Sequence, residues 1–252
     1  MKLLVNGQLI DYTDEGSGRT LLMLHGWGTN GATFDQLAGH FVKNYRVIRF
    51  DFPGFGQSPK PADDWAVCEY AQITHDFLEK MKIDELYAVV AHSFGGRIVI
   101  KGVGLGLLRP EKIVLIDSAG VKPRQSIGKN SFRLLAKVGK RATSLLGLKK
   151  LQPLLRGQLY SVAGTTDYLQ AHQMQQIFLN VINEDLLPEV TKLMQPTLLI
   201  WGEDDIETPL ADARLILDSL SDGRLVAIPK AGHFVYTDAY NAVVNALDGF
   251  LR

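Results

Sequence analysis

The stretch VVAHSFGGRI, residues 89–98, decides how the rest of this chain is interpreted. Its opening residues are β-branched and apolar, which is typical of the end of a buried strand, and its closing residues favour a helix. Ser93 therefore lies on a predicted strand–turn–helix, where strained backbone would push its hydroxyl clear of both elements. Ala91 and Gly95, two residues before and two after the serine, are small enough for such a turn. Alone the signal is weak, because Ala91 replaces the usual glycine and serines also cap ordinary helices.

Composition favours one main soluble domain. The chain has 252 residues, of which 46% are hydrophobic, enough to bury a large core. No charged leader precedes an apolar run and no apolar stretch is long enough to span a membrane, so we expect a cytoplasmic protein. The single cysteine, Cys68, excludes an internal disulfide and a thiolate metal cluster. A net charge of zero gives no indication of a nucleic-acid partner.

Short apolar segments alternate with amphipathic ones along most of the chain, which predicts an α/β fold with an eight-stranded, mostly parallel sheet flanked by helices. The Asn6-Gly7 pair predicts a hairpin between the first two strands. The predicted strands are residues 3–5, 9–12, 20–24, 46–50, 86–91, 112–116, 197–201 and 224–228. Helical patterns lie at about 66–82, 95–108, 210–220 and 236–251.

One interval is far too long for a simple crossover. Residues 119–190 separate two neighbouring strands, whereas such a connection needs only about a dozen residues. We therefore expect an inserted helical cap, or lid, at 119–190, and a core domain formed by 1–118 and 191–252. Within the cap, apolar residues recur at helical spacing, at Phe132, Leu135, Ala136, Ala142, Leu145 and Leu146. Basic residues fall on another face, at Arg133, Lys137, Lys140 and Arg141.

The loops after the predicted parallel strands should carry the site, because ligands of open parallel sheets bind beyond the carboxyl ends of the strands. Several of these loops are unusual in composition. They are HGWG at 25–28, DFPGFGQS at 51–58, the turn at Ser93, WGEDDIETP at 201–209 and AGHFVY at 231–236.

Together these loops, in this order, resemble those of the α/β-hydrolase family over nearly the whole chain outside the predicted cap. That family uses the chain order serine, acid, histidine. The resemblance implies that Ser93 is the nucleophile and His233 its base. It also implies that Asp205 is the acid, because Gly202 and Pro209 frame a Gly-x-x-Asp-x-x-x-Pro pattern.

The resemblance extends to the rest of the site. In the family, two backbone N–H groups stabilise the oxyanion, here those of Trp27 and Phe94. Trp27 and His92 are then expected to contribute to the substrate pocket. His25 is expected to organise its own loop through hydrogen bonds. Asp117 remains an alternative acid, since some members of the fold place theirs after that strand.

A serine, an imidazole and a buried carboxylate in this order predict a hydrolase that cleaves a carboxylic ester through an acyl-enzyme, with no metal or organic cofactor. Relatives that attack with an aspartate, such as haloalkane dehalogenases, are disfavoured by Ser93. The alternatives are an acyl-carrier-protein methyl ester esterase, a carbon–carbon bond hydrolase, or a ligand receptor on this fold with slow turnover. The first of these is supported by LLMLHGWGTN and DFPGFGQS, which are similar to the pimeloyl-acyl-carrier-protein methyl ester esterases.

The predicted cap has an uneven charge. No acidic residue occurs from Ser118 through Thr166, while ten Lys and Arg lie between Lys122 and Arg156. The simplest interpretation is a solvated helix face. Two functional alternatives are an anionic membrane surface and the docking of an acidic carrier protein that delivers a small ester substrate.

Overall fold

The structure is a computed structural model that describes residues 1–122 and 174–252. Most of the predicted cap, including Arg133, Lys137, Lys140 and Arg141, lies outside the described residues. Within the described part of the chain, no helix is both long and apolar enough to cross a membrane.

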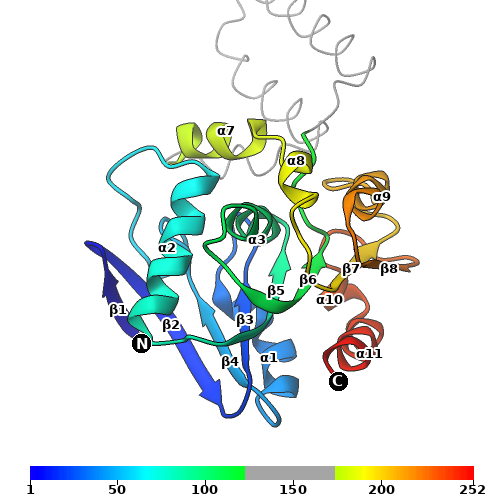
Figure 1. The fold of residues 1–252 in the computed structure, drawn as a ribbon, viewed down its shortest axis with the longest axis horizontal. Coiled ribbons are helices and arrows are strands. Elements are labelled where there is room, and N and C mark those ends of the chain that lie inside the picture. The colour runs from blue at the N-terminus through cyan, green and yellow to red at the C-terminus, as the bar shows by residue number, and fades with distance from the viewer. Residues whose placement is uncertain (123–173) are drawn as a thin grey trace, which may run out of the picture. The chain divides into compact units, whose positions relative to one another are not determined.

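Eight strands form one sheet in the order β1-β2-β4-β3-β5-β6-β7-β8 (Figure 1). The Asn6-Gly7 turn joins the first two strands as an antiparallel hairpin, and both turn residues have positive φ. From β4 to β8 along the sheet, all neighbouring strands are parallel. The predicted eight-stranded, mostly parallel sheet is thus confirmed. The strands are β1 (Lys2–Val5), β2 (Gln8–Gly16), β3 (Thr20–Leu24), β4 (Arg46–Phe50), β5 (Leu86–His92), β6 (Pro110–Ile116), β7 (Thr197–Gly202) and β8 (Gly223–Ile228).

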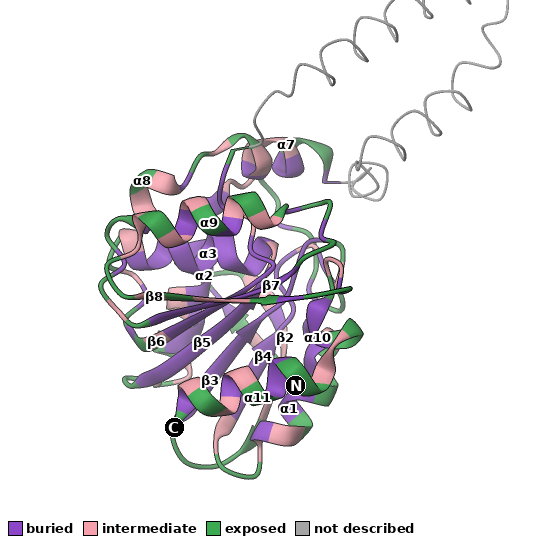
Figure 2. Ribbon diagram, turned by 90° about the vertical axis from the view of Figure 1, so that its right-hand side faces the viewer, coloured by how far each residue is buried: buried purple, intermediate pink, exposed green. Residues whose placement is uncertain are grey.

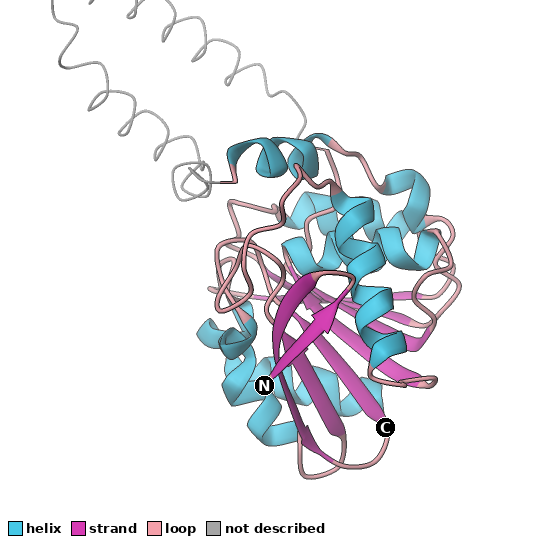
Figure 3. Ribbon diagram, turned by 90° about the vertical axis from the view of Figure 1, so that its left-hand side faces the viewer, coloured by secondary structure: helices cyan, strands magenta, loops and turns pink. Residues whose placement is uncertain are grey.

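Helices cover both faces of this sheet (Figures 2 and 3). On one face lie α1 (Asp35–Phe41) and α11 (Tyr240–Leu251). On the other lie α2 (Val67–Lys80), α3 (Phe94–Gly104) and α9 (Leu210–Ser219). Because both faces are covered, every residue of β3 and β5 is buried, which explains their unbroken apolar sequences. The shorter helices are η1 (Gly31–Phe34), α7 (Gln175–Asn183), α8 (Leu187–Val190) and α10 (Val235–Asp238).

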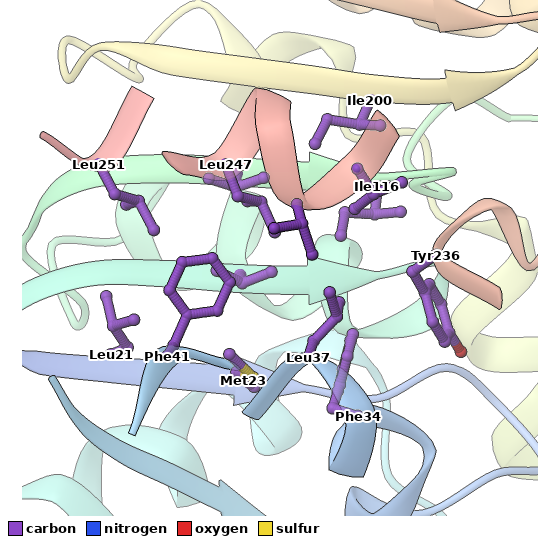
Figure 4. Packing of buried hydrophobic residues seen from close by; sticks show 14 of the residues in the cluster. Leu21, Met23, Phe34, Leu37, Phe41, Ile116, Ile200, Tyr236, Leu247 and Leu251 are labelled. Carbon is purple, nitrogen blue, oxygen red and sulfur yellow. The ribbon is translucent and has the colours of Figure 1, made fainter. Parts of the chain in front are cut away.

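One layer of the core lies between the sheet and the pair α1 and α11 (Figure 4). Alternate strand residues, such as Leu21 and Met23 of β3, point to this side because side chains alternate along a strand. Helix α1 contributes Leu37 and Phe41, which are four residues apart and so share one face of the helix. The other labelled members of the cluster are Phe34, Ile116, Ile200, Tyr236, Leu247 and Leu251.

The predicted helix at 236–251 differs from the structure, which has two helices separated at Ala239. Ala239 has φ −135° and ψ 48°, which are not helical angles. The first helix is held by contacts to distant segments: the Val235 N–H donates to the carboxyl group of Asp117, directly after β6, and the Tyr236 hydroxyl lies 2.9 Å from Oγ1 of Thr33 in η1. Those tertiary contacts override the local helical pattern.

Residues 176–190, which we expected to belong to the cap, contact helix α3. Lys101 Nζ lies 2.8 Å from carboxylate oxygens of both Glu184 and Glu189. The buried Arg97 donates to the Glu184 carbonyl oxygen at 2.8 Å. These contacts attach α7 and α8 to the helix that follows Ser93.

Candidate active site

Ser93 occupies a strained turn between β5 and α3. Its φ of 49° and ψ of −109° are unusual for a residue with a side chain, and such strain is most often found at functional sites. The turn is held by the Ser93 N–H, which donates to the Ile116 carbonyl at 3.1 Å. A Cβ on Gly95 would collide with the Leu24 carbonyl oxygen, so only glycine lets α3 begin this close to β3.

His233 connects Ser93 to Asp205. His233 Nε2 lies 2.9 Å from Ser93 Oγ, and His233 Nδ1 lies 2.8 Å from Asp205 Oδ2. The imidazole side chain is 8% exposed and that of Asp205 is fully buried. The three residues therefore come from the carboxyl ends of β5, β7 and β8 and form a single chain of hydrogen bonds.

Asp205 is surrounded by donors from its own loop. Its Oδ1 accepts the backbone N–H groups of Glu207 at 2.8 Å and Thr208 at 3.0 Å, while the Thr208 hydroxyl donates to Oδ2 at 2.7 Å. Burial alone would raise the pKa of Asp205, but the hydrogen bonds and the charge of His233 lower it below its usual value. Asp205 is thus held as a carboxylate.

The same pair of residues sets the protonation of His233. Burial lowers its pKa, and the hydrogen bond and charge of Asp205 outweigh that effect, so the pKa of His233 lies above its usual value. The carboxylates of Glu207 and Asp117 act in the same direction.

The structure places Asp117, the alternative acid, directly after β6 with no exposed surface. Its Oδ1 accepts the Gly202 N–H at 2.8 Å and its Oδ2 accepts the Val235 N–H at 3.2 Å. Burial raises the pKa of Asp117 to about 7. Asp117 therefore bonds the two loops that carry Asp205 and His233, whereas Asp205 itself contacts the imidazole.

The two predicted oxyanion donors flank the same turn. The Phe94 N–H is the first of helix α3 and therefore has no partner inside that helix. In the described part of the chain, neither this N–H nor that of Trp27 donates to a backbone carbonyl. The Trp27 side chain packs against the rings of Phe55, Phe94 and Phe178, with centroids 4.8, 5.2 and 5.2 Å away.

The two neighbouring histidines are buried and make backbone contacts. His25 Nε2 accepts the Phe52 N–H at 3.0 Å, and Nδ1 donates to the Gly26 carbonyl at 2.8 Å. His92 Nε2 donates to the His233 carbonyl at 2.7 Å, and the two rings lie 4.8 Å apart. Burial lowers the pKa of His25 to about 4 and that of His92 to about 3. Both imidazoles are therefore neutral near pH 7.

Two residues of this site were missed by the sequence analysis. Thr208 follows Asp205 by three positions, and at this spacing an aspartate side chain can accept the backbone N–H and close a turn. The contact between Thr208 and Asp205 could therefore have been predicted from the local sequence. Glu207 brings Oε2 to 3.4 Å from His233 Nε2. Nothing in the sequence around Glu207 predicts this contact, because it depends on how two separate loops meet.

The arrangement is suited to acid–base and nucleophilic chemistry: a hydroxyl hydrogen-bonded to an imidazole, and an imidazole hydrogen-bonded to a carboxylate. Among the described residues, no group of three or more His, Cys, Asp or Glu side chains could hold a metal ion.

Known proteins resemble this chain in sequence and in fold. The chain is 27% identical to the pimeloyl-[acyl-carrier protein] methyl ester esterase of Nitrosomonas europaea, over 92% of this chain and 96% of that protein. It is 26% identical to the 2-hydroxy-6-oxo-6-(2'-aminophenyl)hexa-2,4-dienoic acid hydrolase of Metapseudomonas resinovorans, over 95% of this chain and 86% of that protein. A solved structure of a bacterial membrane phospholipase A superposes with a TM-score of 0.78 at 24% identity, covering 100% of this chain and 84% of that one.

The family comparison covers most of the chain. Residues 21–247 match the model of the alpha/beta hydrolase family, a range that begins in β3, ends in α11 and includes Ser93, Asp205 and His233. This protein therefore belongs to the alpha/beta hydrolase family and is an enzyme.

Proposed function

We propose that this enzyme hydrolyses a carboxylic ester through an acyl-enzyme formed on Ser93, with His233 as general base and acid and Asp205 as the carboxylate that orients it. The observation that supports the proposal is the series of contacts from Ser93 Oγ to His233 Nε2 at 2.9 Å and from His233 Nδ1 to Asp205 Oδ2 at 2.8 Å. A serine hydroxyl is a poor nucleophile unless a base takes its proton, and this geometry provides the base.

The first half of the reaction forms the acyl-enzyme. His233 Nε2 removes the Ser93 proton while Oγ bonds to the carbonyl carbon, and the carbonyl oxygen becomes an oxyanion. The N–H groups of Trp27 and Phe94 donate to that oxyanion, each donor contributing about 3 kcal/mol in enzymes where one has been removed. The imidazolium then gives its proton to the departing alcohol oxygen as the ester C–O bond breaks.

The second half releases the acid. Water gives a proton to His233 Nε2 and attacks the acyl carbon, and the same nitrogen returns a proton to Ser93 Oγ as the acid leaves. Throughout, Asp205 accepts the Nδ1–H, which keeps Nε2 free to accept a proton and stabilises the imidazolium. Thr208 and the backbone of its loop fix Asp205 in place.

A carbon–carbon bond hydrolase is the second candidate, because the Metapseudomonas relative is named as a dienoic acid hydrolase. Against it, HGWGTNG at 25–31 lacks the extended glycine-rich first loop expected of that class. The Nitrosomonas relative, named as a methyl ester esterase of an acyl carrier protein, supports an ester substrate. Docking of an acidic carrier on the basic residues of the cap stays a prediction.

The proposal is tested with p-nitrophenyl esters from acetate to palmitate, beside a 2-hydroxy-6-oxo-dienoate as the carbon–carbon substrate. We expect turnover of at least one ester, and Ser93→Ala should reduce it by about 10⁴-fold or more with the thermal unfolding temperature unchanged. A fluorophosphonate should label Ser93, and Ser221→Ala, a change at an exposed serine, is the control.

Three outcomes contradict the proposal. Undiminished ester hydrolysis in Ser93→Ala would remove Ser93 from the chemistry. Turnover of the dienoate and of no ester would favour the second candidate. Ligand binding with less than one turnover per hour would favour the receptor alternative.

A further inference from the structure

We propose that Glu207 selects substrates by charge, favouring an ester whose departing alcohol is cationic or neutral over one that carries a negative charge near the ester oxygen. The inference deepens the proposed function and rests on it, since it assigns a role on the leaving-group side of the same site. Glu207 determines specificity, while Ser93 and His233 carry out the reaction steps.

The position of Glu207 relative to the reacting atoms carries the inference. Its Oε2 lies 3.4 Å from His233 Nε2, the nitrogen that lies 2.9 Å from Ser93 Oγ. Asp205, in contrast, contacts the opposite nitrogen, Nδ1. Glu207 is therefore a second carboxylate on the imidazole, placed at the edge where protons are exchanged.

The backbone holds Glu207 in this place. Its N–H donates to Asp205 Oδ1 at 2.8 Å, so the residue is part of the turn that fixes the acid. The Glu207 side chain is 33% exposed, whereas the His233 side chain is 8% exposed. The carboxylate thus reaches from the partly exposed rim of the site to a nearly buried ring.

The chemistry of the reaction brings the alcohol to this carboxylate. When the ester bond breaks, the departing oxygen must lie within hydrogen-bonding reach of His233 Nε2 to receive its proton. Any group attached to that oxygen then lies a few ångströms from Glu207. A positive charge there is attracted and a negative charge is repelled, so the effect falls on the alcohol half of the substrate.

The charges around the His233 imidazole support this selection of the departing alcohol by its charge. In the described part of the chain, three carboxyl groups act on the imidazole: Asp205 at Nδ1, Glu207 at Nε2 and Asp117 from the end of β6. His92, packed on the ring from β5, is neutral near pH 7 because burial lowers its pKa to about 3. Of the three carboxylates, Glu207 alone lies at the reacting nitrogen.

The experiment uses phenyl esters with a meta trimethylammonio, tert-butyl or carboxylate substituent, and the acyl chain of the best p-nitrophenyl ester. Because the trimethylammonio group also makes the phenol a better leaving group, each kcat/KM is first divided by the rate constant for cleavage of the same ester by free imidazole. Values of kcat/KM are expressed relative to the neutral tert-butyl ester, so a general loss of activity cancels. The variant is Glu207→Gln, which keeps the shape and removes the charge. Glu203→Gln, an exposed change in the same loop, is the matched control.

In the wild type we expect the cationic ester to be preferred over the anionic one by about tenfold or more, an effect limited by solvent at a one-third exposed side chain. Glu207→Gln should reduce this ratio about five- to tenfold. Glu207→Asp, which keeps the charge, should retain most of the preference, and Glu203→Gln should leave the ratio unchanged.

The pH profile gives a second readout that a merely structural role would not move. Because the Glu207 charge contributes to raising the pKa of His233, Glu207→Gln should shift the acid limb of kcat/KM to lower pH. An unchanged charge ratio in Glu207→Gln overturns the inference. Failure of the proposed function is distinguished by Ser93→Ala, which would then retain ester hydrolysis.

Discussion

Two buried aspartates follow neighbouring strands of the sheet, and the fold uses them differently. Asp117 comes after β6 and Asp205 lies in the loop after β7, and both are at most 5% exposed. Asp205 contacts the imidazole of His233 at 2.8 Å. Asp117 accepts two backbone N–H groups, those of Gly202 and Val235.

The pKa values of these two carboxyls move in opposite directions although both are buried. Burial raises the pKa of Asp117 to about 7, because its neutral donors compensate only part of the lost hydration. The pKa of Asp205 is lowered, because an imidazole that can become positive and a threonine hydroxyl outweigh the same burial. A buried carboxyl thus stays charged at neutral pH where its partner can carry the opposite charge.

The largest effect should come from Asp205→Asn. Two backbone N–H groups, of Glu207 and Thr208, would hold the amide oxygen where Oδ1 now lies, so the amide NH₂ would face His233 Nδ1. That reverses the tautomer and places a hydrogen on Nε2, toward Ser93. We expect kcat to fall by about 10⁴-fold, as in serine proteases.

The measurement is steady-state hydrolysis of the best p-nitrophenyl ester, with circular dichroism to show that the fold is retained. A second sign is expected in the pH profile of the residual activity. Because the Asp205 charge raises the pKa of His233, its removal should move the acid limb to lower pH. A loss below tenfold would show that Asp205 does not serve the imidazole.

Asp117→Asn should have a smaller effect on turnover and a measurable one on stability. An amide can accept only one of the two N–H groups that the carboxyl now accepts, which should cost about 1–3 kcal/mol of the free energy of unfolding. The loops that carry Asp205 and His233 would loosen, and we expect kcat to fall about tenfold, far less than in Asp205→Asn.

The stability difference should itself depend on pH. The raised pKa means that folded Asp117 keeps its proton while the unfolded chain loses it, so the wild type loses stability as pH rises from about 4 to about 7. The variant has no such titration, and its deficit should shrink over that range in urea unfolding at pH 4.5 and 8. A kcat as low as that of Asp205→Asn, with unchanged stability, would make Asp117 the acid.

Much of the fold could be predicted because its strands are locally distinct. Runs such as Thr20–Leu24 are apolar throughout, since β3 is covered on both faces, and the prediction gave this strand the bounds it has in the structure. The order of the strands could not be predicted from such runs, because pairing depends on contacts between distant segments. The break at Ala239 was missed for the same reason, as Val235 and Tyr236 are bonded to residues far away in sequence.

The site residues also differ in whether they could be predicted from local sequence. Ser93 and Gly95 have a sequence signal because the turn itself demands them, and the family order pointed to His233 and Asp205. Whether Asp117 or Asp205 contacts the imidazole could not be decided by spacing alone, since both follow strands at the same edge of the sheet. Glu207 was missed, because an acidic residue in an exposed loop has many ordinary explanations.

Asp204→Asn should have the smallest effect on kcat. It extends the comparison of Asp117 with Asp205 by testing whether the position of a carboxylate matters more than the presence of its charge. Asp204 is exposed, and the contact by which it holds the loop, from its backbone N–H to the Ala231 carbonyl at 2.9 Å, does not involve its side chain. We expect kcat within about twofold of the wild type and stability within about 0.5 kcal/mol.

The charge of Asp204 lies in solvent, where salt at physiological ionic strength screens it within about 8 Å. Any shift of the acid limb of the pH profile should therefore be below about 0.3 pH units and should vanish at high salt. Hydrolysis measured at 20 mM and 500 mM salt checks both points, because the screening length falls about fivefold, from about 21 Å to about 4 Å, between these concentrations. A fall in kcat comparable to that of Asp205→Asn would indicate that Asp204 also serves as the acid. It would contradict the assignment of that role to Asp205 on the basis of its contact with His233.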